Sequence, residues 1–401
     1  MNVNQAQKIM SIKHHGGYSM LELLVAMTIG ILVLSSAVSM QVSNRDGFKS
    51  TTAQLHMKTN AKLATEFIGR SLRGVGAMGC RTADGLVGVK KENAAGNSSY
   101  KIILNADVNT RVPLPHANFN AGHEVLGYQA SDTGWVTPAP HSSLNLTNML
   151  AGSDAITLRG TIGEAYVLAP RTNGDAAYNL DIPAGTDVRI AENNFAVAAT
   201  CAAAEVFHVT STDAQIDAGI IGRASGAGAD DNNVLFGTYD SDNSIEAEVF
   251  GELMRMATTT YYIGQNAAGI PTLYRNLDGI SSPLIEGVER MKLDYGIEDD
   301  KNGIRNVAAR YLPASQIQAT CNNPMSVPTK DGCLWPDVVS IRVSLIMRSK
   351  EAVFGKDIVK TYTLPGTDEL DLNVNDQYAR SIYSTTFTLR NRVIGDRTNK
   401  G

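Results

Sequence analysis

The carboxylate of Glu22 is the only charged group between Tyr18 and Met40. A helix over these residues is about 35 Å long at ~1.5 Å per residue, which is enough to cross the hydrocarbon core of a bilayer. An acidic side chain within such a helix costs about 3 kcal/mol on insertion scales, unless it has a partner or lies near the interface. We therefore expect a second group to compensate the charge of Glu22.

The residues before the apolar run do not fit a secretory signal peptide. Such a peptide has its apolar core before the cleavage site, whereas Gly16 and Gly17 precede the core here. From Gly17 to Glu22 the chain instead resembles the class III leader of type IV prepilins and of type II secretion pseudopilins. That pattern is a short basic leader ending in Gly, an aromatic residue or Met, a few small or apolar residues, and then Leu-Glu.

This resemblance implies a processing reaction and a partner for the buried charge. A prepilin peptidase at the cytoplasmic face would cut between Gly17 and Tyr18, and the new amine of Tyr18 would be N-methylated. Glu22 would then neutralise the amino terminus of a neighbouring subunit, since opposite charges buried together recover much of their desolvation cost. The alternative is that Glu22 reaches the lipid headgroups or is simply tolerated in an ordinary anchor.

A polar segment with a helical pattern follows the apolar run. It contains no proline from Phe48 to Val75, and apolar residues three or four positions apart form a stripe along it. These residues are Leu63, Phe67, Ile68, Leu72 and Val75. The sequence therefore predicts one long helix, with a transmembrane part over 18–40 and an amphipathic part over 41–78.

The glycines of "GVGAMGC", Gly74 to Cys80, match the pattern G-x-G-x-x-G. A dinucleotide-binding fingerprint must follow a strand and open a helix, whereas a helix precedes these glycines. Because Gly adopts a left-handed conformation at little cost, we interpret the stretch as the end of the helix.

The rest of the chain reads as mostly β. Short runs rich in Val, Ile, Thr and Tyr are separated by Gly, Asn, Asp and Pro. They begin near residues 153, 205, 233, 257, 287, 337 and 383. The run from Val339 to Arg348 alternates apolar and polar side chains almost throughout, so that strand is expected to bury one face, against the amphipathic part of the helix.

The expected fold class is α+β and pilin-like, with a long N-terminal α-helix, transmembrane then amphipathic, packed on an antiparallel β-sheet with a large β-rich head. The expected divisions are a leader (1–17), the two helix parts, a β-rich periplasmic head with an insertion (79–280) and a C-terminal β-region that completes the sheet (281–401).

Four cysteines fit a head exported to an oxidising compartment. Cys321 and Cys333 bracket a turn-rich loop, so we expect them to pair, which leaves Cys80 with Cys201. Other pairings remain open. A zinc site is disfavoured, because the chain has no C-x-x-C and its seven histidines show no ligand spacing.

Composition and motifs favour neither nucleic-acid binding nor catalysis. The 35 Lys and Arg against 40 Asp and Glu give a formal charge of −5, without the basic excess that nucleic acid attracts. We find no G-x-S-x-G or H-E-x-x-H motif, and we expect no enzyme activity, cofactor or resident metal. Calcium remains open at two acidic stretches, 240–248 and 298–303, although the second has Ala309 where a calcium loop needs a bidentate Glu.

Further stretches resemble the PilW family of minor pilins. They are "EFIGRSLR" with "GVGAMGC", "TYYIG" with "GIPTLYR", "GVERMKLDYGI", and a closing strand "TFTLRNRV". The likeness is continuous over the first 80 residues and patchy from about Ser153, while Arg81 to Ala151 shows none.

This second resemblance implies a minor pilin in the complex that primes type IV pilus assembly and sits near the tip, supporting twitching motility, adhesion or DNA uptake. Its partners would be other minor pilins, the major pilin, the prepilin peptidase, the inner membrane and the pilus assembly platform. The protein would cross the inner membrane once with a periplasmic head before joining the fibre at the cell surface. The alternatives are a type II secretion minor pseudopilin and a membrane-tethered tip adhesin or periplasmic enzyme.

Overall fold

The structure is a computed structural model of the 401-residue chain. It describes residues 19–78, 81–82, 101–104, 124–131, 133–136, 139–140, 144–168, 179–183, 185–199, 203–222, 251–299, 307–321, 333–366 and 370–393. The chain divides into two compact units, Met1–Thr52 and Ala53–Gly401. Each unit is described by itself.

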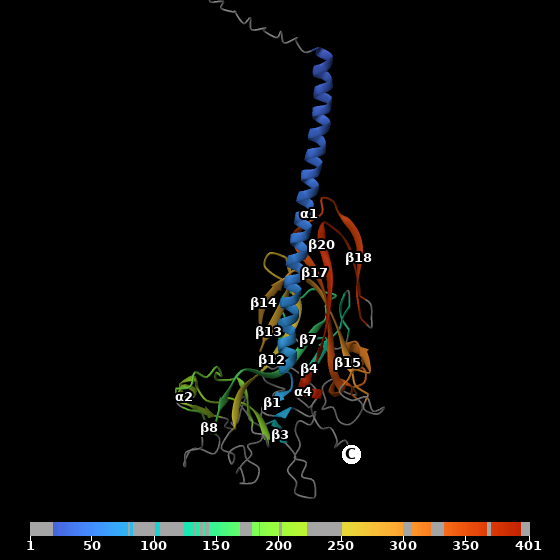
Figure 1. Cartoon of the computed structure of the whole chain (residues 1–401). Coiled ribbons are helices and arrows are strands. Elements are labelled where there is room, and N and C mark those ends of the chain that lie inside the picture. The colour runs from blue at the N-terminus through green and yellow to red at the C-terminus, as the bar shows by residue number, and fades with distance from the viewer. Residues whose placement is uncertain are drawn as a thin grey trace, which may run out of the picture. The chain divides into compact units, whose positions relative to one another are not determined.

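A single helix, α1 (Met20–Gly74), runs through the boundary between the units (Figure 1). Ser19 begins it, because its side-chain Oγ accepts from the backbone N–H of Leu21 at 3.3 Å. The helix ends at Gly74, four residues before the expected boundary at Met78. Gly76 then adopts a φ of +69°, which Gly does without strain, and the chain turns into a short strand, β1 (Ala77–Met78). The glycine stretch therefore does end the helix.

The second unit contains a large sheet built around the long strand β12 (Glu252–Gln265). One edge of β12 pairs with β7 (Ala155–Val167); the other pairs first with β9 (Phe195–Ala199) and then with β13 (Pro271–Leu277). All pairings in this sheet are antiparallel except the one between β10 and β3. The remaining strands are β14 (Ile280–Glu286), β10 (Ala203–His208), β3 (Lys101–Leu104) and β4 (Val125–Tyr128).

A second antiparallel sheet has the order β16-β15-β17-β20. Its strands are β16 (Arg310–Leu312), β15 (Val288–Ile297), β17 (Val338–Ala352) and β20 (Tyr378–Thr388). Gly287 links the two sheets between β14 and β15, with a φ of +84° that favours Gly. Its N–H donates to Pro271 and its carbonyl accepts from Arg348, so this corner is hydrogen-bonded to both sheets.

Smaller elements complete the described chain. There are three two-stranded sheets besides the hairpin of β18 (Ile358–Leu364) and β19 (Leu370–Asp376). They pair β1 with β2 (Arg81–Thr82), β5 (Ala130–Ser131) with β6 (Gly134–Trp135), and β8 (Asn179–Asp181) with β11 (Ile220–Gly222). The short helices are α2 (Asp213–Asp217), α3 (Ala314–Gln318), the 3-10 turn η3 (Trp335–Asp337) and α4 (Arg390–Val393).

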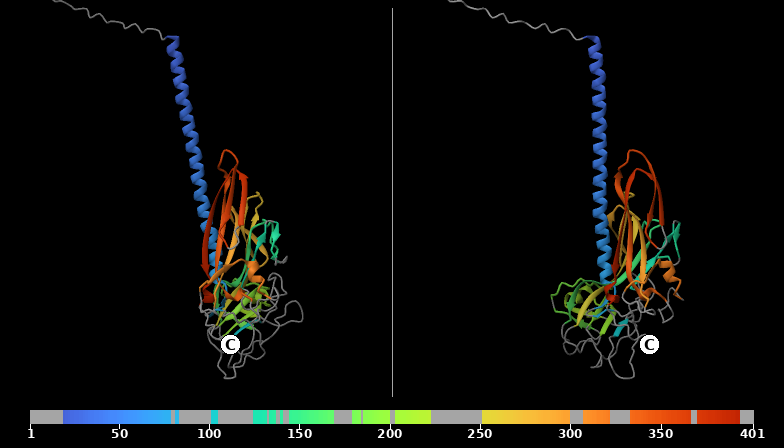
Figure 2. Two further views of the ribbon diagram at one scale, coloured as in Figure 1. Left: turned by 90° about the vertical axis from the view of Figure 1, so that its right-hand side faces the viewer. Right: turned by 45° about the vertical axis from the view of Figure 1, so that its right-hand side comes forward.

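The main core joins the C-terminal half of α1 to both large sheets. Figures 1 and 2 show β17 and β20 beside this half of the helix. The helix contributes small residues as well as large ones: Met57, Ala61, Ala64, Ile68, Gly69 and Leu72 are buried. Leu63, expected in the apolar stripe, is instead 45% exposed. The alanines and Gly69 form the contact because they let the helix backbone approach the sheet closely.

Both faces of the central strand β17 are covered, which corrects the prediction of one buried face. Ile341 and Val343 belong to the core shared with α1. On the other face, Ser344 donates to the carbonyl of Pro365 at 3.2 Å, just after β18. Ile346 is also fully buried. The segment that ends β18 thus shields the face expected to meet solvent.

A separate, smaller core lies within the second unit. It joins the end of β7 to β9, β10, β8, β11 and α2. Its buried members are Tyr166, Leu168, Leu180, Ile182, Ile190, Ala196, Ala198, Phe207, Val209, Ile216, Ile221 and Leu253. His208 on β10 is 2% exposed with its ring edge-on to Phe195, as expected of a structural histidine.

Candidate assembly helix and its anchorage

The helix segment of the first unit presents an apolar surface to its surroundings. Its large apolar side chains from Met20 to Val42 are all at least half exposed. This part of α1 is long and apolar enough to cross a membrane once. Soluble monomers rarely expose an apolar surface of this size, so it requires a bilayer or other helices around it.

Glu22 lies in the first turn of α1, within this apolar surface. Its side chain is exposed, and no described residue forms an ion pair with it. A carboxylate in the first turn interacts favourably with the positive end of the helix dipole. Gly17 and Tyr18, the predicted cleavage and methylation positions, lie outside the described residues, so the processing reaction stays a prediction.

Side-chain hydrogen bonds hold the second half of α1 to the large sheet. The Tyr261 hydroxyl donates to the carbonyl of Phe67 at 3.1 Å and lies 2.8 Å from Ser71 Oγ. Asn60 Nδ2 donates to the carbonyl of Glu286 at 3.1 Å, beside the corner between the sheets. Burial raises the pKa of Tyr261, so its hydroxyl stays protonated and able to donate at neutral pH.

The end of α1 is held from two sides. Val75 forms a β-bridge with Gly160 of β7. Asn391 Nδ2 donates to the carbonyl of Arg73 at 3.2 Å and to that of Val75 at 2.8 Å. The last helical carbonyls have no partner within a helix, and Asn391 provides one.

The position of Asn391 corrects the predicted extent of the closing strand. The closing strand was predicted to continue to Val393, but β20 ends at Thr388 and residues 390–393 form α4. The turn at Leu389 brings Asn391 to the end of α1. The pattern of β-formers contained no signal for this long-range cap.

Two glycines allow the close approach of α1 to the sheets. A Cβ on Gly69 would overlap the ring of Phe387 on β20. A Cβ on Gly160 would lie 2.5 Å from the carbonyl oxygen of Gly74. Any larger residue at either position must therefore move its neighbour.

The disulfide between Cys321 and Cys333 confirms one predicted pairing. It joins a residue three positions after the end of α3 to one two positions before the start of η3. Trp335 of η3 is fully buried edge-on to Tyr295 and donates its Nε1–H to Gln318 at 2.9 Å. Both cysteines pack against the core that contains this aromatic pair. The second predicted pair, Cys80 with Cys201, lies outside the described residues.

A charged network fixes the β18–β19 hairpin region to the second sheet. Arg380 on β20 makes bidentate pairs with Glu289 and Asp376, and its side chain is 2% exposed. Hydrogen bonds from Arg380 lower the pKa of Asp376. The guanidinium of Arg348 lies 4.5 Å from the ring centre of Tyr378. Sequence reasoning missed this network, because its members are up to 91 positions apart.

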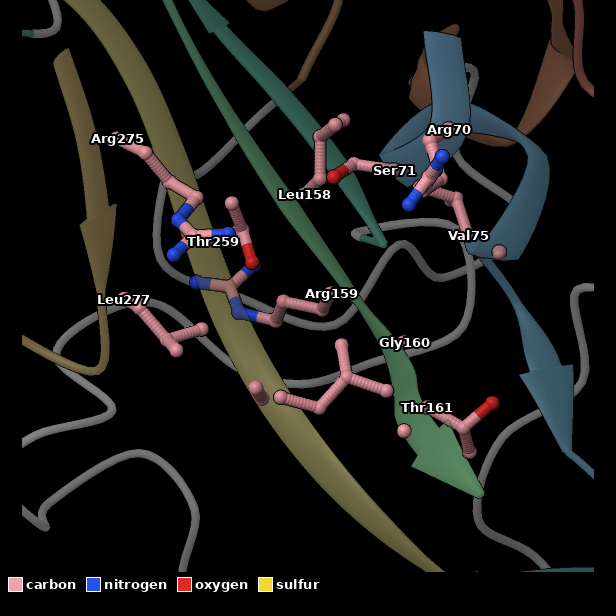
Figure 3. Close-up of a pocket in the computed structure, with 14 residues that line it drawn as sticks. Arg70, Ser71, Val75, Leu158, Arg159, Gly160, Thr161, Thr259, Arg275 and Leu277 are labelled. Atoms are coloured by element: carbon pink, nitrogen blue, oxygen red, sulfur yellow. The ribbon is translucent and has the colours of Figure 1, made fainter. Parts of the chain in front are cut away.

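A pocket of about 360 Å³ lies where the end of α1 meets the large sheet (Figure 3). We call it the helix-end pocket. Arg70 and Ser71 come from the last turns of α1, Leu158–Gly163 from β7, Ala257 and Thr259 from β12, and Arg275 and Leu277 from β13. Gly74 and Val75 complete it.

Metal ligation was left open in the sequence at two acidic stretches. The first stretch, 240–248, lies outside the described part of the chain. Of the second stretch the structure describes Glu298 and Asp299, while residues 300–303 lie outside the described part. Within the described residues no three His, Cys, Asp or Glu side chains gather as metal ligands.

The fold and its anchorage define a class: an α+β protein with one N-terminal helix that can span a membrane and a β-rich unit packed on the second half of that helix. The family model described as PilW, type IV pilus-assembly protein W, matches residues 260–391. The matched segment runs from within β12 through β20 to α4, and it supports an assignment to the PilW family. The match supports a role in type IV pilus assembly. No curated protein and no solved structure gives a significant match.

Proposed function

We propose that the protein is a minor pilin that joins the complex priming type IV pilus assembly and remains near the tip of the fibre. The observation that carries the proposal is the exposed apolar segment of α1 with one carboxylate in its first turn. The PilW match in the β-rich unit supports the same assignment from a different part of the chain.

The proposed assembly step is the packing of this segment among the helices of other subunits. Before assembly, the same apolar surface lies in the inner membrane with the amino terminus in the cytoplasm and the β-rich unit in the periplasm. Glu22 meets the amine of a neighbouring subunit after the peptidase has cut at Gly17. A buried carboxylate without its partner is costly, so the pairing favours assembly over isolated insertion.

Variants of Glu22 test this step. Glu22→Gln removes the charge at nearly constant shape, while Glu22→Asp retains it and serves as the matched control. We expect Glu22→Gln to insert into the membrane but to co-purify less with other pilins, and Glu22→Asp to retain more of this association. If partner pilins co-purified with Glu22→Gln in the same amount as with the wild-type protein, the charge pairing would be contradicted.

The cellular role is tested by deleting the chain. We expect fewer pili and reduced twitching or DNA uptake, with normal secretion of folded proteins. Loss of secretion with normal pili would favour a type II secretion pseudopilin instead. Normal pilus number with lost surface attachment would favour a tip adhesin.

The partners are identified by recovering the full chain from membranes in mild detergent and analysing the bound proteins by mass spectrometry. We expect other minor pilins, the major pilin and components of the assembly platform. We propose no enzymatic role, and a head that turned over a hydrolysable substrate would argue for the membrane-tethered enzyme.

A further inference from the structure

Cationic side chains line the helix-end pocket. Its described lining residues include three arginines and no Asp or Glu. Figure 3 shows Arg70 on the last turns of α1 and Arg275 on β13, with β7 and β12 passing between them. These two guanidinium groups reach the pocket from different elements.

Neighbouring arginines have acidic partners, whereas these two have none within the part of the chain that the structure describes. Arg73 pairs with Glu66 at 2.9 Å, and Arg255 pairs with Asp278 at 2.8 Å. By contrast, the side chains of Arg70 and Arg275 form no hydrogen bond or ion pair with any residue in the described ranges.

Arg275 has the stronger need for a hydrogen-bond acceptor, because its Nε is buried without a partner among those residues. A buried donor left unsatisfied costs free energy that a bound acceptor would recover. Arg159, the third arginine of the lining, already interacts with other side chains, so we do not include it among the groups that would bind a ligand. It is 3% exposed, and its guanidinium interacts with Tyr128 and Glu124.

The positive charges of Arg70 and Arg275 both act on one hydroxyl. Both guanidinium groups act to lower the pKa of Tyr261, although burial outweighs them. They therefore lie within electrostatic reach of the same point, where Tyr261 meets Ser71. Thr259 adds a hydroxyl that makes no hydrogen bond within the described chain. Paired guanidinium groups with hydroxyl donors suit carboxylate and phosphate oxygens.

We propose that the helix-end pocket is an anion-binding site that takes a carboxylate or phosphate group between Arg70 and Arg275. A bound anion satisfies Arg275 Nε and bridges the last turns of α1 to β13. Because it binds the folded state, it stabilises the junction between helix and sheet. The proposal does not depend on the pilus assignment.

The test is calorimetric titration of the detergent-solubilised full chain with glutarate and, separately, with inorganic phosphate at constant ionic strength. We expect saturable binding of at least one anion and a higher melting temperature in its presence. The anion that binds more tightly distinguishes a carboxylate site from a phosphate site.

Three variants assign the binding to the pocket. Arg70→Gln and Arg275→Gln should each weaken binding about tenfold or more, which is typical of a lost charge-assisted hydrogen bond. Arg73→Gln, on the same turn but paired with Glu66 outside the pocket, should leave binding unchanged. Arg70 is exposed, so its variant reports on binding even if Arg275→Gln fails to fold. Absence of saturable binding by both anions, or equal affinity in Arg70→Gln and wild type, would overturn the proposal.

Discussion

Substitution of Gly69 by Ala tests whether α1 is seated against β20 as closely as the structure shows. In a free helix this change is favourable by up to about 1 kcal/mol, because Gly is a poor helix former. In this chain the added Cβ overlaps the ring of Phe387, with two further ring carbons at 3.0 and 3.1 Å. Ordinary carbon contacts are about 3.5–4.0 Å.

The expected cost follows from these distances. Overpacking by one carbon costs about 1–3 kcal/mol, which outweighs the gain in helix propensity. The matched control is Gly47→Ala on the same helix, where a Cβ meets nothing within 4 Å. We therefore expect Gly69→Ala to be less stable than Gly47→Ala by about 1–3 kcal/mol.

The assay is denaturant unfolding of the full chain in detergent, followed by the signal of the β-rich unit. A second change, Phe387→Leu, removes the ring atoms and should recover much of the loss in the double variant. Equal stability of Gly69→Ala and Gly47→Ala, or no coupling to Phe387, would refute the close packing of α1 on β20.

Three further predictions concern the β-rich unit. Burial raises the pKa of Asp154 to about 6, above the unfolded value near 3.8, so its contribution to stability is present below pH ~4 and lost as pH rises through 6. The stability profile of Asp154→Asn should lack this decline, and an unchanged slope between pH 4 and 6 would contradict it. Arg380→Gln removes the ion-pair partner of Asp376 and leaves Glu289 with only its longer pair to Arg348, at 3.7 Å. It should cost about 3 kcal/mol in urea unfolding, whereas Lys350→Gln, at an exposed pair, should cost less than ~1 kcal/mol. Equal losses would be inconsistent with the buried network. Reduction of Cys321–Cys333 should lower the melting temperature by removing about 3 kcal/mol of loop-closure stabilisation, and an unchanged melting temperature would count against a structural role for the bridge.

Features with local sequence signals were predictable. The apolar run and the glycines after it define α1 to within four residues at its end. Runs of β-branched residues locate β7, β12, β15 and β17, because period and composition depend on neighbours in the chain. The disulfide at Cys321 follows from two cysteines around one loop.

Features that depend on distant partners were not predictable. Leu63 fits the helical stripe, yet Ala61 and Ala64 make the contact, because the shape of the joined sheets decides which helical face fits closely. The buried second face of β17 depends on a hairpin that packs on it. The sequence pattern predicts a strand at Asn391. In the structure its side chain instead donates to a carbonyl at the end of α1, 316 positions earlier.

The proposed function requires that α1 packs among the helices of other subunits after the first 17 residues have been removed. Intact mass analysis of the chain recovered from sheared pili and from membranes tests it most directly, with a Gly17→Leu variant as the uncut reference. We expect a mature protein that begins at a methylated Tyr18 and is present in the pilus fraction. A chain that keeps residues 1–17 and is absent from pili would contradict it.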